Sequence, residues 1–410
     1  MTSKSSTRAA PLASLPWLLV LGIALGGLSG CGGGAKRAPH EKAYLLERRD
    51  AADKQVVEDI RGIVNKVLTR TKAEYDDYAA GRRPDPPVVD ILIISGGGDW
   101  GAFGAGYLKG WKSRPATDPL AMPEFDVVTG VSTGALIAPF AFLSTDESIQ
   151  RIEHLYRNPK KDWVKQRWPL YFLPNNISFA EVPGLERELR QQVTPEMIRA
   201  IAERGRDGRL CAVNTTNLDD ASPRVFDLVA EAQRASDTGD MSRMYNIMLA
   251  SSGIPGAFPY REIDGDMYVD GGVTSNIIYG GRMSEEDTLT AAWARQYPDV
   301  PIPKTRFWVI FNNQLRTLPT TVAPRWPAIV TRSLELATRS ATVTAMRHLH
   351  AMAEISRLKR KADVEVRIVA IPDDWTAPVE GVFKKETMND LADLGERMGA
   401  DPRSWHTEPP

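Results

Sequence analysis

The run VVDILIIS at residues 88–95 is the feature that most constrains the fold. Its apolar, largely β-branched residues follow one another without polar alternation, which is typical of a parallel-sheet strand buried on both faces. Similar runs predict strands at 125–129, 210–218, 224–228, 267–272, 307–313 and 364–371. Helical patterns occur at 241–252, 327–362 and 384–398. Strands that alternate with helices predict an α/β domain with a largely parallel sheet.

The beginning of the chain has the character of a targeting segment. Lys4 and Arg8 precede an apolar run that is too short and too rich in Gly and Ser for a membrane span, so residues 1–30 are interpreted as a signal peptide. The run ends in LSGC, which resembles the lipobox of bacterial lipoproteins. This resemblance implies that Cys31 is lipidated and anchors the protein in a membrane of the bacterial cell envelope. An ordinary secretory signal with a chance cysteine is the alternative.

The rest of the chain divides into three parts. Residues 31–86 are expected to form a tether and a helix, because apolar residues such as Ile60, Ile63 and Val67 recur at helical spacing within 41–80. The segment GRRPDPP then interrupts the pattern. We expect the main domain at 87–400 and a short tail at 401–410.

The net charge and the cysteine content limit the partners and the disulfide bonds to be expected. The 410 residues carry a net charge of −1, which gives no reason to expect a nucleic-acid partner. Cys211 is the only cysteine besides Cys31 and lies in the apolar run LCAVN. We therefore expect no disulfide framework and a small buried side chain at this position.

A glycine-rich loop follows the strand at 88–95. Gly96, Gly97, Gly98 and Gly101 stand before a predicted helix, where backbone N–H groups and the helix dipole can bind an anion. The anion could be a phosphate or the oxyanion of an acyl-transfer intermediate. GGGDWG matches the dinucleotide fingerprint, but Asp126 stands at the wrong end of its strand for that motif. A tight turn without a ligand is a further alternative.

A second motif, GVSTG, lies between a predicted strand and a predicted helix. Gly130, Ser132 and Gly134 have the spacing G-x-S-x-G of a serine nucleophile on a sharp turn. A serine hydroxyl needs a base to remove its proton. The motif also arises by chance in long chains, so its position between strand and helix is what favours a catalytic role.

The base is not evident among the histidines. None of the five, His40, His154, His348, His350 and His406, stands in a setting typical of a catalytic loop. Asp270 is a better candidate, because it ends the strand MYVD directly before Gly271, where α/β sheets expose functional groups. A simple turn is the alternative for D-G-G, since Asp and Gly are common in turns.

Taken together, the ordered motifs resemble those of the patatin-like phospholipases. The blocks ASSGIPGAFPY at 250–260 and TNL at 216–218, and Asn276 after the D-G-G, are also similar to that family. The resemblance covers roughly residues 88–315, and it implies a three-layer α/β/α domain. Trp100 is a departure, because the family usually has Arg or Lys at this position.

The resemblance also implies a mechanism. Ser132 would be the nucleophile, Asp270 its partner in a dyad without histidine, and the backbone of Gly96, Gly97 and Gly98 the oxyanion hole. The expected protein is a membrane-tethered serine acyl hydrolase that acts on phospholipids or lysophospholipids, without a metal or organic cofactor. The alternatives are a non-catalytic lipid-binding envelope lipoprotein and a Ser-His-Asp esterase.

Overall fold

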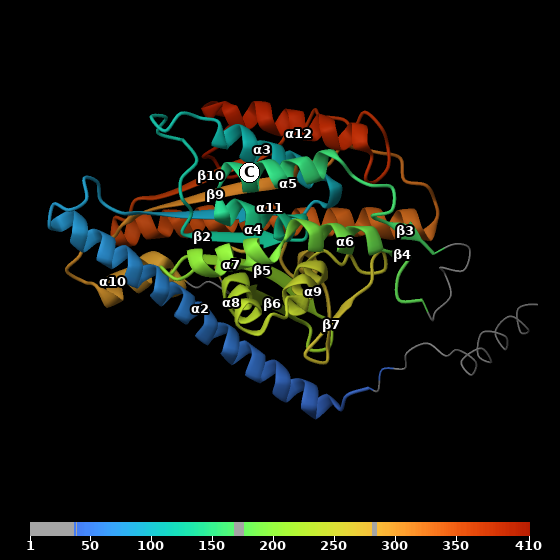
Figure 1. The fold of residues 1–410 in the computed structure, drawn as a ribbon, viewed down its shortest axis with the longest axis horizontal. Coiled ribbons are helices and arrows are strands. Elements are labelled where there is room, and N and C mark those ends of the chain that lie inside the picture. Colours follow the sequence, from blue (N-terminus) through green and yellow to red (C-terminus); the bar gives the residue numbers. More distant parts are fainter. Residues whose placement is uncertain (1–36, 38, 168–175, 281–284) are drawn as a thin grey trace, which may run out of the picture.

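The computed structural model describes residues 37, 39–167, 176–280 and 285–410 (Figure 1). An eight-stranded sheet has the strand order β10-β9-β1-β2-β5-β8-β7, and β6 pairs with β5 beside this path. The strands are β1 (Val88–Ile94), β2 (Val127–Val131), β5 (Leu210–Asn217), β6 (Ser222–Asp227), β7 (Arg261–Ile263), β8 (Asp266–Asp270), β9 (Lys304–Gln314) and β10 (Val364–Ile371). A separate small sheet pairs β3 (Lys165–Gln166) with β4 (Ala180–Glu181). The predicted signal peptide and Cys31 lie outside the described residues.

The sheet is parallel through most of its width. Strands β10, β9, β1, β2 and β5 are each parallel to their neighbour in this order. Strand β6 pairs antiparallel with the other edge of β5. Strand β8 pairs antiparallel with β5 beyond the end of β2, and β7 pairs antiparallel with β8. The prediction of an α/β fold with a largely parallel central sheet is therefore confirmed.

The helices surround this sheet, and those predicted from the sequence end within two residues of their expected limits. The helices are α2 (Lys42–Ala79), α3 (Gly101–Lys112), α4 (Thr133–Leu143), α5 (Asp146–Arg157), α6 (Pro183–Gln192), α7 (Pro195–Arg204), α8 (Leu228–Thr238), α9 (Ser242–Ser251), α10 (Leu289–Gln296), α11 (Trp326–Arg360) and α12 (Lys385–Ala400). Short 3-10 turns are η2 (Gly98–Trp100), η3 (Gly271–Val273), η4 (Glu285–Asp287) and η5 (Pro402–Ser404). In the described part of the chain, no helix is both long and apolar enough to cross a membrane.

Both faces of the sheet are covered, as the predominantly apolar character of β1 predicted. Leu92 and Ile94 belong to one hydrophobic cluster, which includes Phe103 of α3. Ile93 points to the other face and belongs to a second cluster with Met346 of α11. Alternate residues of one strand thus contribute to two cores, which is the arrangement of a three-layer α/β/α domain.

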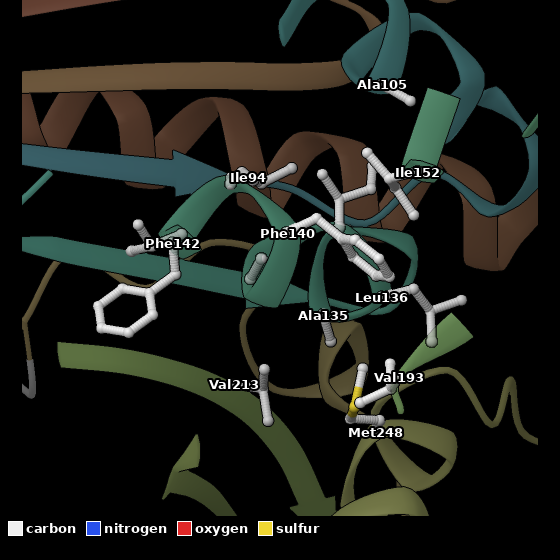
Figure 2. Close-up of a cluster of buried hydrophobic side chains, with 14 of the residues drawn as sticks. Ile94, Ala105, Ala135, Leu136, Phe140, Phe142, Ile152, Val193, Val213 and Met248 are labelled. Atoms are coloured by element: carbon white, nitrogen blue, oxygen red, sulfur yellow. The ribbon is translucent and has the colours of Figure 1, made fainter. Parts of the chain in front are cut away.

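Helix α4 lies at the centre of the first core. Nearly all of its residues are buried, in agreement with the apolar sequence ALIAPFAFL. Figure 2 shows Leu136 and Phe140 of α4 among side chains from other elements, including Ile94 of β1, Val213 of β5 and Met248 of α9. Because α4 is packed on all sides, the residue at its N-terminus is held in a fixed position.

Helix α2 packs on the domain instead of forming a separate unit. Val67 and Leu68 are buried, at 2% and 1% exposure. Arg70 forms an ion pair with the buried Asp126, and Arg48 binds Asp266 at 2.6 Å. Figure 1 shows α2 running diagonally along the lower edge of the domain.

The C-terminal residues differ from the expected tail at 401–410. Trp405 is 7% exposed, and its ring lies 4.9 Å from that of Trp111 and 5.1 Å from that of Trp308. The backbone of His406 pairs with Ile368 of β10. The Pro-rich composition suggested a tail, but burial of a large indole holds this segment on the domain.

Candidate active site

Ser132 occupies the sharp turn between β2 and α4. Its backbone has φ +53° and ψ −121°, a strained conformation for a residue with a side chain. The turn needs glycine on both sides. A Cβ on Gly130 would lie 2.2 Å from the carbonyl oxygen of Gly134, and a Cβ on Gly134 would lie 2.2 Å from that of Ile94. The G-x-S-x-G spacing is thus required by the close approach of β1, β2 and α4.

The strand register explains why Asp270 lies beside Ser132. Strand β2 pairs in parallel with β5 and ends with Val131 opposite Asn214. Strand β8 approaches from the opposite direction and ends with Asp270 opposite the next residue, Thr215. Strand β6 occupies the other edge of β5 along this stretch, so β2 and β8 share one edge and meet end to end. Their last residues therefore converge, although they are far apart in sequence.

The two side chains interact directly. The Ser132 hydroxyl is close enough to the Asp270 carboxylate to lower its pKa, and the Gly272 N–H donates a hydrogen bond to Asp270 Oδ1 at 2.7 Å. Each of the two residues is only 6% exposed. Burial raises the pKa of Asp270 from 3.8 to about 6, and the interactions with Ser132 and with the Gly272 N–H oppose this rise. A carboxylate with this pKa is a stronger base than an ordinary aspartate.

The end of α9 fixes both residues of this pair. Ser251 Oγ accepts a hydrogen bond from the Ser132 N–H at 3.0 Å and donates to the Asn214 carbonyl at 2.6 Å. Ser252 Oγ donates to the Ser132 carbonyl at 3.1 Å. The Asp270 N–H donates to the Gly253 carbonyl at 3.0 Å. The ASSG of the 250–260 block thus positions the serine and the aspartate, a role that the sequence motif alone did not indicate.

The glycine loop after β1 reaches the same place. The Gly96 N–H donates to Asn276 Oδ1 at 3.0 Å, so it is occupied and is not an open oxyanion donor, which corrects the prediction for this residue. The N–H groups of Gly97 and Gly98 donate to no other described residue. Gly98 has φ +61°, which favours glycine. Gly97 and Gly98 are therefore the candidate oxyanion donors, and Asn276 positions the loop.

Neighbouring residues anchor this loop without the basic residue usual in the resembling family. The Asp99 carboxylate is 7% exposed and accepts a hydrogen bond from the Phe383 N–H at 2.7 Å. The ring of Trp100 packs edge-on against Trp375, with centroids 5.1 Å apart. Aromatic packing and one buried carboxylate thus hold the segment from which the glycine amides project.

The family model described as "Patatin-like phospholipase" matches residues 92–280. Residues 92–280 are thus similar to this family. The matched span includes the glycine loop, the Ser132 turn and Asp270, and it ends before β9. Strands β9 and β10 lie outside the match but complete the same sheet. The three-layer fold expected from the resemblance is accordingly the one observed.

Two mammalian proteins similar to this chain carry the same printed name, calcium-independent phospholipase A2-gamma. The mouse protein is 25% identical over 247 residues, which are 57% of this chain and 29% of the relative. The human protein is 26% identical over 266 residues, or 63% of this chain and 31% of the relative. The chain thus spans less than a third of their length. The crystal structure of VipD from Legionella pneumophila aligns with a TM-score of 0.32 and 12% identity, covering 75% of this chain and 67% of that one, a likeness that carries no argument.

Two of the histidines have hydrogen-bond partners outside the Ser132–Asp270 pair. His348 Nδ1 is hydrogen-bonded to the Tyr279 hydroxyl at 2.9 Å, and His154 Nδ1 lies 3.3 Å from Asn158 Nδ2. His350 is half-buried in α11, and desolvation lowers its pKa below the ordinary value. No recorded hydrogen bond joins a histidine to Ser132 or Asp270 among the described residues. The same residues contain no cluster of His, Cys, Asp and Glu that could hold a metal ion.

Proposed function

We propose that this protein is a serine acyl hydrolase that cleaves acyl esters of phospholipids or lysophospholipids. The observation that carries the proposal is that Ser132, on its strained turn, lies beside the buried carboxylate of Asp270 and interacts with it. The patatin-like domain and the printed name of its mammalian relatives support the substrate class. No hydrogen bond joins a histidine to Ser132 or Asp270 among the described residues, which favours a Ser-Asp dyad over a Ser-His-Asp triad.

The first half of the reaction forms an acyl-enzyme. Asp270 accepts the hydroxyl proton while Ser132 Oγ bonds to the carbonyl carbon of the ester. The negative charge that develops on the carbonyl oxygen faces the N–H groups of Gly97 and Gly98, which are fixed before the substrate arrives. The bond to the leaving alcohol then breaks, and Asp270 returns its proton to that alcohol.

The second half releases the fatty acid. Water attacks the acyl carbon and gives one proton to Asp270, and Ser132 Oγ leaves and recovers that proton. Because the pKa of Asp270 is about 6, the carboxylate is mostly ionised at pH 7 yet basic enough to take part in proton transfer. Burial of the pair at 6% exposure keeps bulk water away from the developing charges.

Membrane attachment is a further part of the proposal. The LSGC sequence supports lipidation of Cys31, which would tether the domain to a membrane of a bacterial cell envelope. A tether would hold the enzyme beside its lipid substrate. This attachment involves neither Ser132 nor Asp270, so it is tested independently of catalysis.

A lipid hydrolysis panel tests the activity. The full chain is assayed on phospholipids and lysophospholipids of different head groups, and released fatty acid is measured. Ser132→Ala should lose activity, whereas Ser236→Ala, a matched change at an exposed serine of α8, should not. A wild-type protein that releases no fatty acid, but binds lipid equally well with and without Ser132→Ala, would support a non-catalytic lipid-binding protein instead.

A further inference from the structure

The N-terminal turns of α11 carry an exposed apolar face. Five large apolar side chains recur at helical spacing, so they lie along one side of the helix. We call these five residues the docking face: Trp326, Ile329, Val330, Leu334 and Leu336, with exposures of 69%, 51%, 55%, 41% and 43%. None of them belongs to either hydrophobic cluster of the described structure. In Figure 1, α11 crosses most of the width of the domain.

Polar contacts hold the later turns of α11 on the domain. Arg339 is 6% exposed and donates to Asn313 Oδ1 at 2.7 Å. Thr342 is 1% exposed, and its hydroxyl accepts a hydrogen bond from Asn276 Nδ2 at 3.2 Å. An ordinary surface helix turns its apolar side inward and its polar side to water. In the N-terminal turns of α11 the large apolar side chains are exposed instead, and a contiguous exposed apolar face of this kind marks an interaction site.

The helix that carries the docking face also contacts the surroundings of the active site through its buried side. Asn276, which Thr342 contacts, also accepts the Gly96 N–H at 3.0 Å. A Cβ on Gly96 would lie only 3.0 Å from Ser132 Cβ. A partner on the outer side of α11 is therefore separated from the reactive serine by the helix, one asparagine and the glycine loop.

We propose that the docking face binds the surface of a phospholipid bilayer. A tryptophan with several branched aliphatic residues on one side of a helix suits the boundary between head groups and acyl chains. The charged residues of segment 315–347 are Arg316, Arg325, Arg332, Arg339 and Arg347 against a single Glu335. Three of these arginines, Arg316, Arg325 and Arg347, are exposed.

This charge excess favours anionic lipids, because basic residues near a membrane surface are attracted by its negative potential. A second copy of this chain would carry the same excess and be repelled by it. The inference rests on the proposed function for its biological meaning, since a bilayer would supply the lipid that the site cleaves. The binding itself does not require catalysis.

A local fluorescence measurement tests the contact directly. The full chain carries Ser132→Ala, so that lipid is not consumed, and Cys31→Ser, so that no lipid is attached there. Ile329→Cys is labelled with an environment-sensitive nitrobenzoxadiazole dye, while the fully buried Cys211 remains unlabelled. Thr331→Cys is the matched control, because Thr331 is exposed on the polar side of the same helix. The vesicles contain phosphatidylcholine with or without phosphatidylglycerol.

The expected result is a blue shift and a rise in emission of about twofold or more for the dye at position 329, strongest with phosphatidylglycerol, and little change at position 331. Equal responses at the two positions, or no response at either, would overturn the proposal. A dye at position 329 that is already shielded in buffer would overturn it as well. A dimer that dissociates with Val330→Glu would identify a second copy as the partner and would likewise contradict it.

An activity ratio separates this inference from the proposed function. Ile329→Glu should reduce hydrolysis of vesicle lipid, relative to hydrolysis of a dispersed short-chain ester, by about tenfold, because a buried apolar contact becomes a charge. Thr331→Glu should leave this ratio near the wild-type value. An unchanged ratio in Ile329→Glu contradicts docking. If the wild type cleaves neither substrate, the proposed function fails, and the fluorescence measurement alone decides whether α11 binds the bilayer.

Discussion

Replacement of Asp270 by asparagine should abolish activity and stabilise the protein at the same time. Asparagine keeps the shape of the side chain, and its carbonyl oxygen can accept the Gly272 N–H as the carboxylate does at 2.7 Å. The amide is not basic, so the Ser132 proton has no acceptor. General base catalysis typically contributes about 10²–10⁴-fold, and we expect turnover to fall by at least that range. The residual rate should approach that of Ser132→Ala, because the two residues act as one unit.

The stability change follows from the pKa of Asp270. A rise from 3.8 in the unfolded chain to about 6 in the folded protein corresponds to about 3 kcal/mol, at about 1.36 kcal/mol for each factor of ten in the ionisation constant. Below pH 4 both states are protonated, and the group has little effect. Between about pH 4 and pH 6 the unfolded state loses its proton first, so stability falls as pH rises. Above pH 6 the full cost of the buried charge is present.

Denaturant unfolding at two pH values checks this reasoning. Asp270→Asn should raise the free energy of unfolding by up to about 3 kcal/mol at pH 8 and by less than about 1 kcal/mol at pH 4. Asp85→Asn, at an exposed aspartate outside the site, is the matched control and should change neither value appreciably. A variant that keeps near-native turnover would refute the role of Asp270 as the base. A gain of equal size at both pH values would refute the account of its buried charge.

Two further predictions follow from the same geometry, and a third follows from the LSGC sequence. The value of kcat/KM should rise with pH through an apparent pKa of about 6, as Asp270 loses its proton, and a profile that is flat from pH 5 to pH 8 would contradict this assignment. Gly97→Val should lower turnover by about 10²–10³-fold, because a Cβ at this position would lie 2.2 Å from the Asn312 carbonyl oxygen and shift the candidate oxyanion donor; a folded variant with wild-type kcat argues against that donor. Cys31→Ser should release the protein from membranes or stall its processing, whereas unchanged membrane fractionation and mature mass would count against lipidation.

Much of the fold could be predicted from the sequence because its signals are local. The apolar run of β1 specifies a strand buried on both faces, and alternate residues such as Leu92 and Ile93 do contribute to opposite cores. The turn at Ser132 could be recognised for the same reason, since the G-x-S-x-G motif lies within one strand–turn–helix unit. Asp270 was found from its position at the end of an apolar strand.

Other parts of the site depend on contacts between distant segments, which no local pattern encodes. Ser251 is a common residue at the end of a helix, and only the folded chain brings its hydroxyl to the Ser132 N–H. Asn276 could be noticed in the sequence as part of a motif. Only the fold shows that it accepts a hydrogen bond from the Gly96 N–H, which leaves the N–H groups of Gly97 and Gly98 open. Trp405 was hidden by its Pro-rich surroundings, because a buried indole in a terminal segment requires a complementary surface elsewhere. Helices α5 to α8 are short amphipathic elements, and their positions became clear only from packing.

Detection of an acyl-enzyme on Ser132 tests the central claim most directly. The full chain is mixed with a slowly deacylated ester or a fluorophosphonate, quenched and digested, and the mass of the peptide that contains Ser132 is measured. The account predicts a covalent adduct on Ser132 in the wild type, strongly reduced adduct formation in folded Asp270→Asn, and none at this position in Ser132→Ala. Hydrolysis that proceeds with no adduct on Ser132, or an adduct that forms at the wild-type rate without the Asp270 carboxylate, would contradict it.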